Sequence, residues 1–122
     1  MAETPKELVV VITRGADHEL SSVAFTIANG GMTAGLKVSI FLTSAAVDLV
    51  RKRAVEGLVV HPLEPLQALI KDFLARGGQL WACTPCVKAR GYEQSDLIDG
   101  VEIAGSSAMH ERILAGAATL SF

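Results

Sequence analysis

Short apolar runs alternate with helical segments along the whole of this 122-residue chain. The runs are continuously apolar and rich in Val, Ile and Leu, which is typical of strands buried on both faces of a parallel sheet. Five strands are predicted, over residues 7–13, 36–43, 79–82, 101–104 and 118–122. Strands separated by helices pair in parallel through right-handed crossovers. The alternation therefore predicts an α/β fold with a mainly parallel five-stranded sheet.

Apolar residues at helical spacing predict the helices between these strands. They cover residues 18–29, 45–54, 66–76 and 108–115, and a short segment from about Pro85 to Gly91. Asp17 and Ser44 are candidate caps for the first two helices, and Gly35 is a candidate stop for the first. No linker, repeat or low-complexity segment divides the chain. Residues 1–122 are therefore predicted to form a single domain.

The composition is unusually apolar for so short a chain. Hydrophobic residues make up 50% of the sequence, and the mean hydropathy is +0.39. A sheet covered on both faces explains part of this excess, and a subunit interface explains another part. We expect both. The formal net charge of −2 provides no basic field that would attract nucleic acid, so that class of partner is excluded.

No apolar run has the length of a membrane span, and the amino-terminal residues 1–7 are polar, unlike a signal peptide. The chain is therefore expected to be cytoplasmic, in a reducing compartment. In that setting two cysteines separated by two residues more often serve catalysis, redox chemistry or metal binding than structure.

Both cysteines, Cys83 and Cys86, follow the predicted third strand, and Lys88 and Arg90 come soon after them. A thiol at the carboxyl end of a parallel strand, near positive charge, is a candidate nucleophile. The pattern departs from a thioredoxin-type dithiol, because it follows the third strand and no proline comes after Pro85. A metal site needs more ligands, and the histidines stand singly along the chain, so no metal or cofactor is predicted.

A persulfide carrier needs only one activated thiol and cationic surroundings, which the segment from Cys83 to Arg90 offers. Several segments of the sequence also resemble a known family. The segment Thr13–Asp17, the strand 36–43, and Cys83 with its spacing to Arg90-Gly91 are similar to the DsrE/DsrF-like family, which includes the TusD-type sulfur-relay proteins. The segment 99–105 is similar to its carboxyl-terminal part, so the likeness covers almost the whole chain.

The resemblance implies a flavodoxin-like three-layer α/β/α domain, assembly into trimers or hexamers, and sulfur transfer through Cys83 in a sulfurtransferase-type relay. Donor and acceptor proteins or small persulfides would be its partners. Lys88 and Arg90 would supply positive potential. Cys86 departs from the TusD-type pattern, and two alternatives to the carrier stay open. One is a thiol-disulfide switch or reductase that uses both cysteines. The other is an assembly or regulatory subunit in which the cysteines have no chemical role.

Overall fold

The computed structural model describes residues 6–122, and its centre is a five-stranded parallel sheet. The strands are β1 (Glu7–Ile12), β2 (Lys37–Leu42), β3 (Gln79–Cys83), β4 (Val101–Ala104) and β5 (Ala118–Ser121). Their order across the sheet is β4-β3-β2-β1-β5, and each neighbouring pair is parallel. The α/β class and the five strands predicted from the sequence are confirmed. Residues 1–5, which contribute to the expectation of no signal peptide, lie outside the described part.

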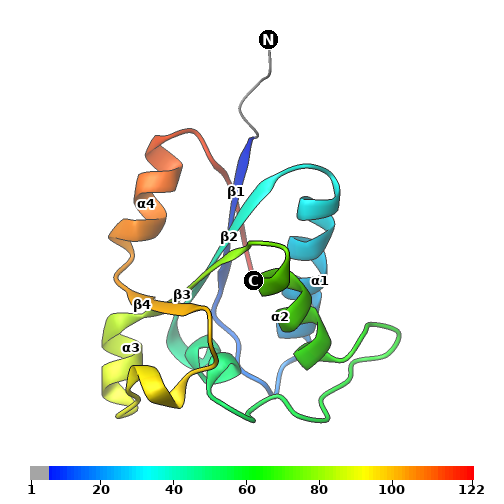
Figure 1. The fold of residues 1–122 in the computed structure, drawn as a ribbon, viewed down its shortest axis with the longest axis vertical. Coiled ribbons are helices and arrows are strands. Elements are labelled where there is room, and N and C mark those ends of the chain that lie inside the picture. The colour runs from blue at the N-terminus through cyan, green and yellow to red at the C-terminus, as the bar shows by residue number, and fades with distance from the viewer. Residues whose placement is uncertain (1–5) are drawn as a thin grey trace.

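Helices cover the sheet on its two sides (Figure 1). They are α1 (Glu19–Thr33), α2 (Leu66–Ala75), α3 (Thr84–Ala89) and α4 (Ser107–Leu114), with 3₁₀ turns η1 (Ser44–Val50) and η2 (Gln94–Asp96). The chain moves across the sheet from β1 through β4 and then returns to place β5 beside β1. Because crossovers are right-handed, this reversal puts α4 on the side opposite α1 and α2.

The first helix is longer than the sequence predicted. It continues through Gly30 and Gly31 and ends before Gly35, whose φ of 101° is a left-handed conformation that favours glycine. A Cβ atom on Gly31 would lie 3.3 Å from side chains of β1 and β2, so this glycine lets the helix approach the sheet. The predicted cap at Asp17 is wrong. His18 caps the helix, because its Nδ1 accepts the backbone N–H of Leu20.

The second predicted helix, over residues 45–54, is instead the shorter 3₁₀ turn η1. Ser44 does not cap it: the N-cap position is Thr43, without a side-chain hydrogen bond, and Ser44 has a φ of 55°. The turn ends where Arg51 becomes extended and forms an isolated antiparallel bridge with Leu97. Tertiary contacts at the sheet edge therefore override the helical pattern here.

Burial is uneven across the sheet. β2 is buried from Val38 to Leu42, whereas all four residues of β5 are exposed and α4 has no buried residue. The side chain of Leu114 on α4 is 88% exposed, and Leu120 on β5 is 43% exposed. Part of the apolar excess therefore lies in the covered sheet, and part remains on the side of α4 and β5. None of the helices within residues 6–122 is long and apolar enough to cross a membrane.

Substitution of Gly78 tests the close packing of helix α2 at the start of β3, and substitution of Gly30 is the control. A Cβ atom on Gly78 would overlap the ring of Phe73 and lie 2.6 Å from Met32 Cε, whereas one on Gly30 would meet no atom within 4 Å. We expect Gly78→Ala to lower the free energy of unfolding by about 1–3 kcal/mol, as overpacking does. The control Gly30→Ala should raise it by about 0.5–1 kcal/mol through helix propensity. Urea denaturation measures both, and equal effects of the two substitutions would contradict this description of the core.

Candidate functional site at the carboxyl edge of the sheet

The candidate site lies where β2 and β3 end. The two strands pair in register, with Leu42 opposite Ala82, so the residues that follow, Thr43 and Cys83, leave the sheet at the same edge. Helix α3 begins directly after Cys83, and the 3₁₀ turn η1 begins directly after Thr43. Thr43 and Ser44 both lie within hydrogen-bond distance of the sulfur of Cys86 in α3, so η1 and α3 meet at this edge. The parallel sheet thus brings together two segments about 40 residues apart in the sequence.

The two thiols differ in exposure. Cys83 ends β3 and occupies the N-cap position of α3, and it is only 8% exposed. Cys86 lies in the following helix and is half-buried. Neither forms a disulfide. Cys86 is therefore the thiol with better access for a partner molecule.

The sulfur of Cys86 has hydrogen-bond partners in Thr43 and Ser44. The backbone N–H of Ser44 donates to Cys86 Sγ over 3.2 Å, and Thr43 Oγ1 lies 3.6 Å from the same sulfur. Ser44 has a positive φ, which is uncommon for a residue other than glycine, and this conformation accompanies the N–H contact to sulfur.

These contacts lower the pKa of Cys86. Burial alone raises the pKa of this thiol, because it penalises the charged form. The hydrogen bonds from Thr43 and Ser44, followed by the neighbouring Cys83 thiol and the charge of Arg90, outweigh burial, so the pKa lies below its usual value. Because the thiolate is the nucleophilic form of cysteine, a lowered pKa favours Cys86 as the attacking thiol.

A network of ion pairs and hydrogen bonds joins the end of helix α3 to η1. Arg90 Nε lies 3.1 Å from Asp48 Oδ1, and Arg90 Nη1 donates to the backbone oxygen of Cys86 over 3.4 Å. The hydroxyl of Tyr92 donates to the same Asp48 Oδ1 over 2.7 Å. This hydrogen bond, followed by burial, raises the pKa of Tyr92, while Arg51, stacked over its ring, and Arg90 act in the opposite direction. Tyr92 is therefore a hydrogen-bond donor that holds Asp48 in place.

Of the residues predicted from the sequence, the structure brings Cys83, Cys86 and Arg90 together. Lys88 lies exposed in the last turn of α3 and forms no hydrogen bond or ion pair with its side chain in the described part of the chain. Across residues 6–122 no group of three or more His, Cys, Asp or Glu side chains is placed to hold a metal ion.

Four members of the site, Thr43, Ser44, Asp48 and Tyr92, were not predicted from the sequence. One signal was available for the first two: they follow a buried parallel strand, and the carboxyl ends of such strands share one edge. The roles of Asp48 and Tyr92 depend on how η1 and the segment after α3 pack, which no local pattern encodes.

Comparison with known proteins identifies the family. The sequence model of the DsrE/DsrF-like family matches residues 6–122. This chain is a member of that family. The resemblance recognised from the sequence is thereby confirmed, and members of the DsrE/DsrF-like family commonly act in sulfur relay.

Two of the relatives are of similar length to this chain. An uncharacterized protein of Methanocaldococcus jannaschii is 31% identical over 110 residues, which cover 88% of this chain and 89% of the relative. An uncharacterized protein of Methanopyrus kandleri is 33% identical over 105 residues, covering 86% and 81%.

Solved structures agree with the fold of this DsrE/DsrF-like chain. The ychN protein from E. coli superposes with a TM-score of 0.77 at 22% identity, covering 96% of this chain and 99% of that one. A protein of unknown function from Methanobacterium thermoautotrophicum has the same TM-score at 17% identity, with the same coverage. At these identities the likeness establishes the fold.

The contact from Thr43 can be tested alone. In a Cys83→Ser background, which leaves one thiol and retains a hydroxyl donor, Thr43→Val should raise the pKa of Cys86 by removing a hydrogen bond to the thiolate. The pH profile of iodoacetamide alkylation should move to higher pH, and the rate at pH 7 should fall. Thr43→Ser, which keeps the hydroxyl, should leave the profile near its starting position. An unchanged profile in Thr43→Val would show that this hydroxyl does not stabilise the thiolate.

Proposed function

We propose that this chain relays sulfur as a protein persulfide, in a sulfurtransferase-type reaction at the Cys83 and Cys86 pair, with Cys86 as the thiol that takes up the sulfur. The observation that carries the proposal is the half-buried Cys86 sulfur, which accepts the backbone N–H of Ser44, lies in hydrogen-bond contact with Thr43 Oγ1 and has a lowered pKa. Membership of the DsrE/DsrF-like family supports the class of chemistry. A relay thiol must stay reduced, so we also propose that the protein acts in the cytoplasm.

The environment of the two thiols favours Cys86 for the first step, although the family resemblance assigns the sulfur to Cys83. The Cys86 thiolate attacks the outer sulfur of a donor persulfide, R–S–SH. A bond forms between Cys86 Sγ and that sulfur, the donor S–S bond breaks, and the donor leaves as the thiolate R–S⁻. An acceptor thiolate then attacks the outer sulfur and regenerates the Cys86 thiolate. Neither step needs an external oxidant or reductant.

Cys83 adds a second candidate function, since it is the N-cap residue of the helix that holds Cys86 and its thiol helps to lower the pKa of Cys86. If Cys83 attacks Cys86 Sγ in the persulfide, the two cysteines form a disulfide and the outer sulfur leaves as hydrogen sulfide. The persulfide sulfur is reduced and the two cysteine sulfurs are oxidised. A thiol reductant must then restore the pair. In this case the protein is a sulfur reductase or a thiol-disulfide switch.

We further propose that the chain assembles with copies of itself. The apolar surface of α4 and β5, with Leu114 and Leu120 exposed, is the surface that such a contact would cover. The family resemblance favours a trimer or hexamer. If the cysteines had no chemical role, this surface would be the basis for the alternative of an assembly subunit. Sedimentation of the purified chain as a monomer at micromolar concentration would contradict self-assembly.

Intact-protein mass spectrometry tests the relay and distinguishes the two thiols. After incubation with a persulfide donor, the wild type should gain the mass of one sulfur atom, removable by a reductant. Cys83→Ser should still gain it, because Cys86 keeps its partners, and Cys86→Ser should not.

Three other outcomes of this experiment would change the assignment of the acceptor thiol or of the function. Loading lost only in Cys83→Ser would assign the acceptor to Cys83, as the resemblance implies, and would overturn the order of steps given above. A loss of two hydrogen atoms in the wild type, with release of hydrogen sulfide, would favour the switch. No change in any variant would overturn both chemical functions.

A further inference from the structure

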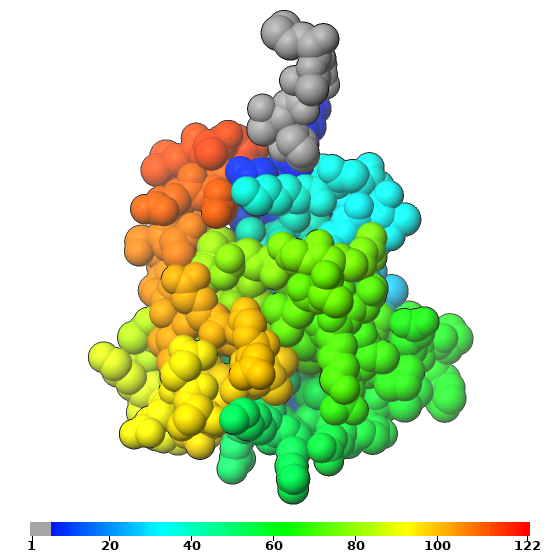
Figure 2. Space-filling view, viewed as in Figure 1, coloured from blue at the N-terminus to red at the C-terminus, as the bar shows by residue number. Residues whose placement is uncertain are grey.

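A cavity lies apart from the two thiols. It has a volume of about 240 Å³ and lies between α2, the segment that follows η1 and the segment that precedes β4. Neither cysteine lines it, nor do Thr43, Ser44 or Arg90. Figure 2 shows the segments that enclose it side by side on one face of the molecule, with α2 in green and the residues before β4 in yellow and orange. The proposed sulfur relay makes no use of this cavity.

The floor of the cavity is aliphatic. Leu49, Val55 and Ile70 are buried, and Leu74 and Ile98 complete the apolar lining. No aromatic side chain lines the cavity, so a flat ring would find no stacking partner there. Apolar pockets with a few polar groups at one side are the usual form of small-molecule sites. The lining therefore suits an aliphatic chain.

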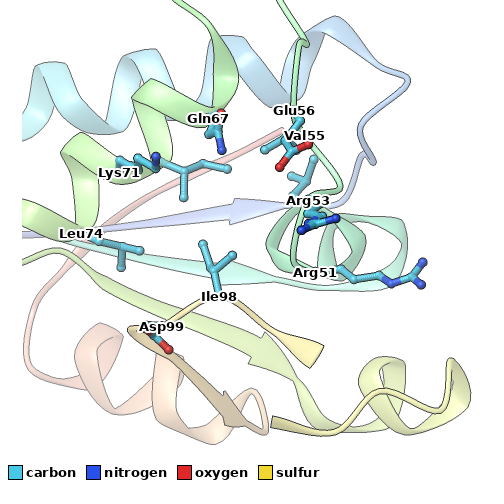
Figure 3. A pocket seen from close by; sticks show the side chains of 11 residues that line it. Arg51, Arg53, Val55, Glu56, Gln67, Lys71, Leu74, Ile98 and Asp99 are labelled. Carbon is cyan, nitrogen blue, oxygen red and sulfur yellow. The ribbon is translucent and has the colours of Figure 1, made fainter. Parts of the chain in front are cut away.

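Cationic side chains reach the cavity from two different elements, Arg53 from the segment after η1 and Lys71 from α2 (Figure 3). Within residues 6–122 neither side chain forms an ion pair. The guanidinium of Arg51, a third lining residue, lies 5.5 Å from the centre of the Tyr92 ring. Two unpaired cations beside an aliphatic floor are suited to the charged end of an amphipathic anion.

Two carboxylates at the same cavity limit the charge of that anion. Glu56 and Asp99 also line it, so three cationic and two anionic side chains give a net charge of +1. A singly charged group matches this balance better than a doubly charged phosphate. A carboxylate is also the planar partner that the guanidinium fork of Arg53 binds with two hydrogen bonds.

The backbone at Arg53 gives a separate reason to expect a function. Arg53 has a φ of 69°, in the left-handed region that is unfavourable for a bulky residue by about 1 kcal/mol. Glycine is free of this strain, yet an arginine stands at the position. Conformations of this kind are concentrated at functional sites.

We propose that this cavity binds a small aliphatic carboxylate, with its chain on the floor formed by Leu49, Val55 and Ile70 and its carboxylate at Arg53 and Lys71. A water molecule occupies about 30 Å³ of liquid. The cavity volume of about 240 Å³ therefore holds a chain of about six to eight carbon atoms, each similar in size to a water molecule.

Titration of the isotope-labelled full chain with octanoate, followed by amide NMR shifts, tests the site. Saturable shifts should be confined to residues 51–56, the facing turns of α2, and residues 98–99. In a series of carboxylates of increasing length, the dissociation constant should fall about fourfold for each added methylene until the cavity is filled, and then level off. Octanol, which lacks the charge, should bind about tenfold more weakly or worse.

A matched pair of variants tests the role of Arg53. Arg53→Gly removes the guanidinium and relieves the positive φ, so it should remain folded while the affinity for octanoate falls about tenfold or more. Lys52→Ala removes a neighbouring positive charge that does not line the cavity, and it should change the affinity by no more than about twofold. Equal losses in the two variants would reduce the effect to general electrostatics and overturn the site.

Two further outcomes would also overturn the proposal. Shifts centred on the exposed apolar surface at Leu114 and Leu120 would show non-specific binding of the alkyl chain. Absence of any saturable shift up to the solubility limit of octanoate would show that the cavity takes no such ligand. The NMR shifts and the affinity for octanoate do not depend on the cysteines. Failure of the proposed sulfur relay would therefore leave this test unaffected.

Discussion

The parallel register of β2 and β3 is the constraint on which the rest of the candidate site depends. Pairing of Leu42 with Ala82 makes both strands end at one edge and sets Thr43 beside Cys83. A shift of the register by one residue would turn every side chain of β3 to the opposite face, where it would have to fit the close packing of the other covered side of the sheet. The register is fixed because Ile40 and Leu42 pack with Leu80 and Ala82 in one core. Core packing thus determines that the backbone N–H of Ser44 meets Cys86 in helix α3.

The site combines a rigid sheet edge with a locally strained turn. Ser44 adopts its positive φ at the first residue of η1, and its N–H then reaches Cys86 Sγ. Strain of this kind, on the order of 1 kcal/mol, persists only where the surroundings determine the conformation. Here a Cβ atom on Gly15 would lie 3.3 Å from the backbone oxygen of Ala45, so glycine lets the loop after β1 pack closely on the same turn. The loop after β1 therefore belongs to the structural support of the thiol site.

Local pattern and tertiary packing explain which features the sequence could predict. The strands and α2 were predictable, because their apolar spacing reflects burial in a covered parallel sheet. The cysteine position was predictable for the same reason, since Cys83 follows a buried strand. The turn η1 was not, because its apolar residues have helical spacing while its backbone follows contacts at the sheet edge. The different environments of Cys83 and Cys86 could not be predicted either, since the contacts of Cys86 come from Ser44, about 40 residues away in the sequence.

Asp48 pairs with Arg90, and hydrogen bonds therefore contribute more than charge to the lowered pKa of Cys86. Asp48 Oδ1 accepts from both Arg90 and Tyr92, so the guanidinium nearest the thiol is already paired with a carboxylate. Its effect on the pKa of Cys86 is accordingly smaller than the effects of Thr43 and Ser44. Salt screens exposed charges strongly, whereas hydrogen bonds in a half-buried site are screened much less. Because η1 contains both Ser44 and Asp48, this single turn donates a hydrogen bond to the Cys86 sulfur and holds Arg90 in an ion pair.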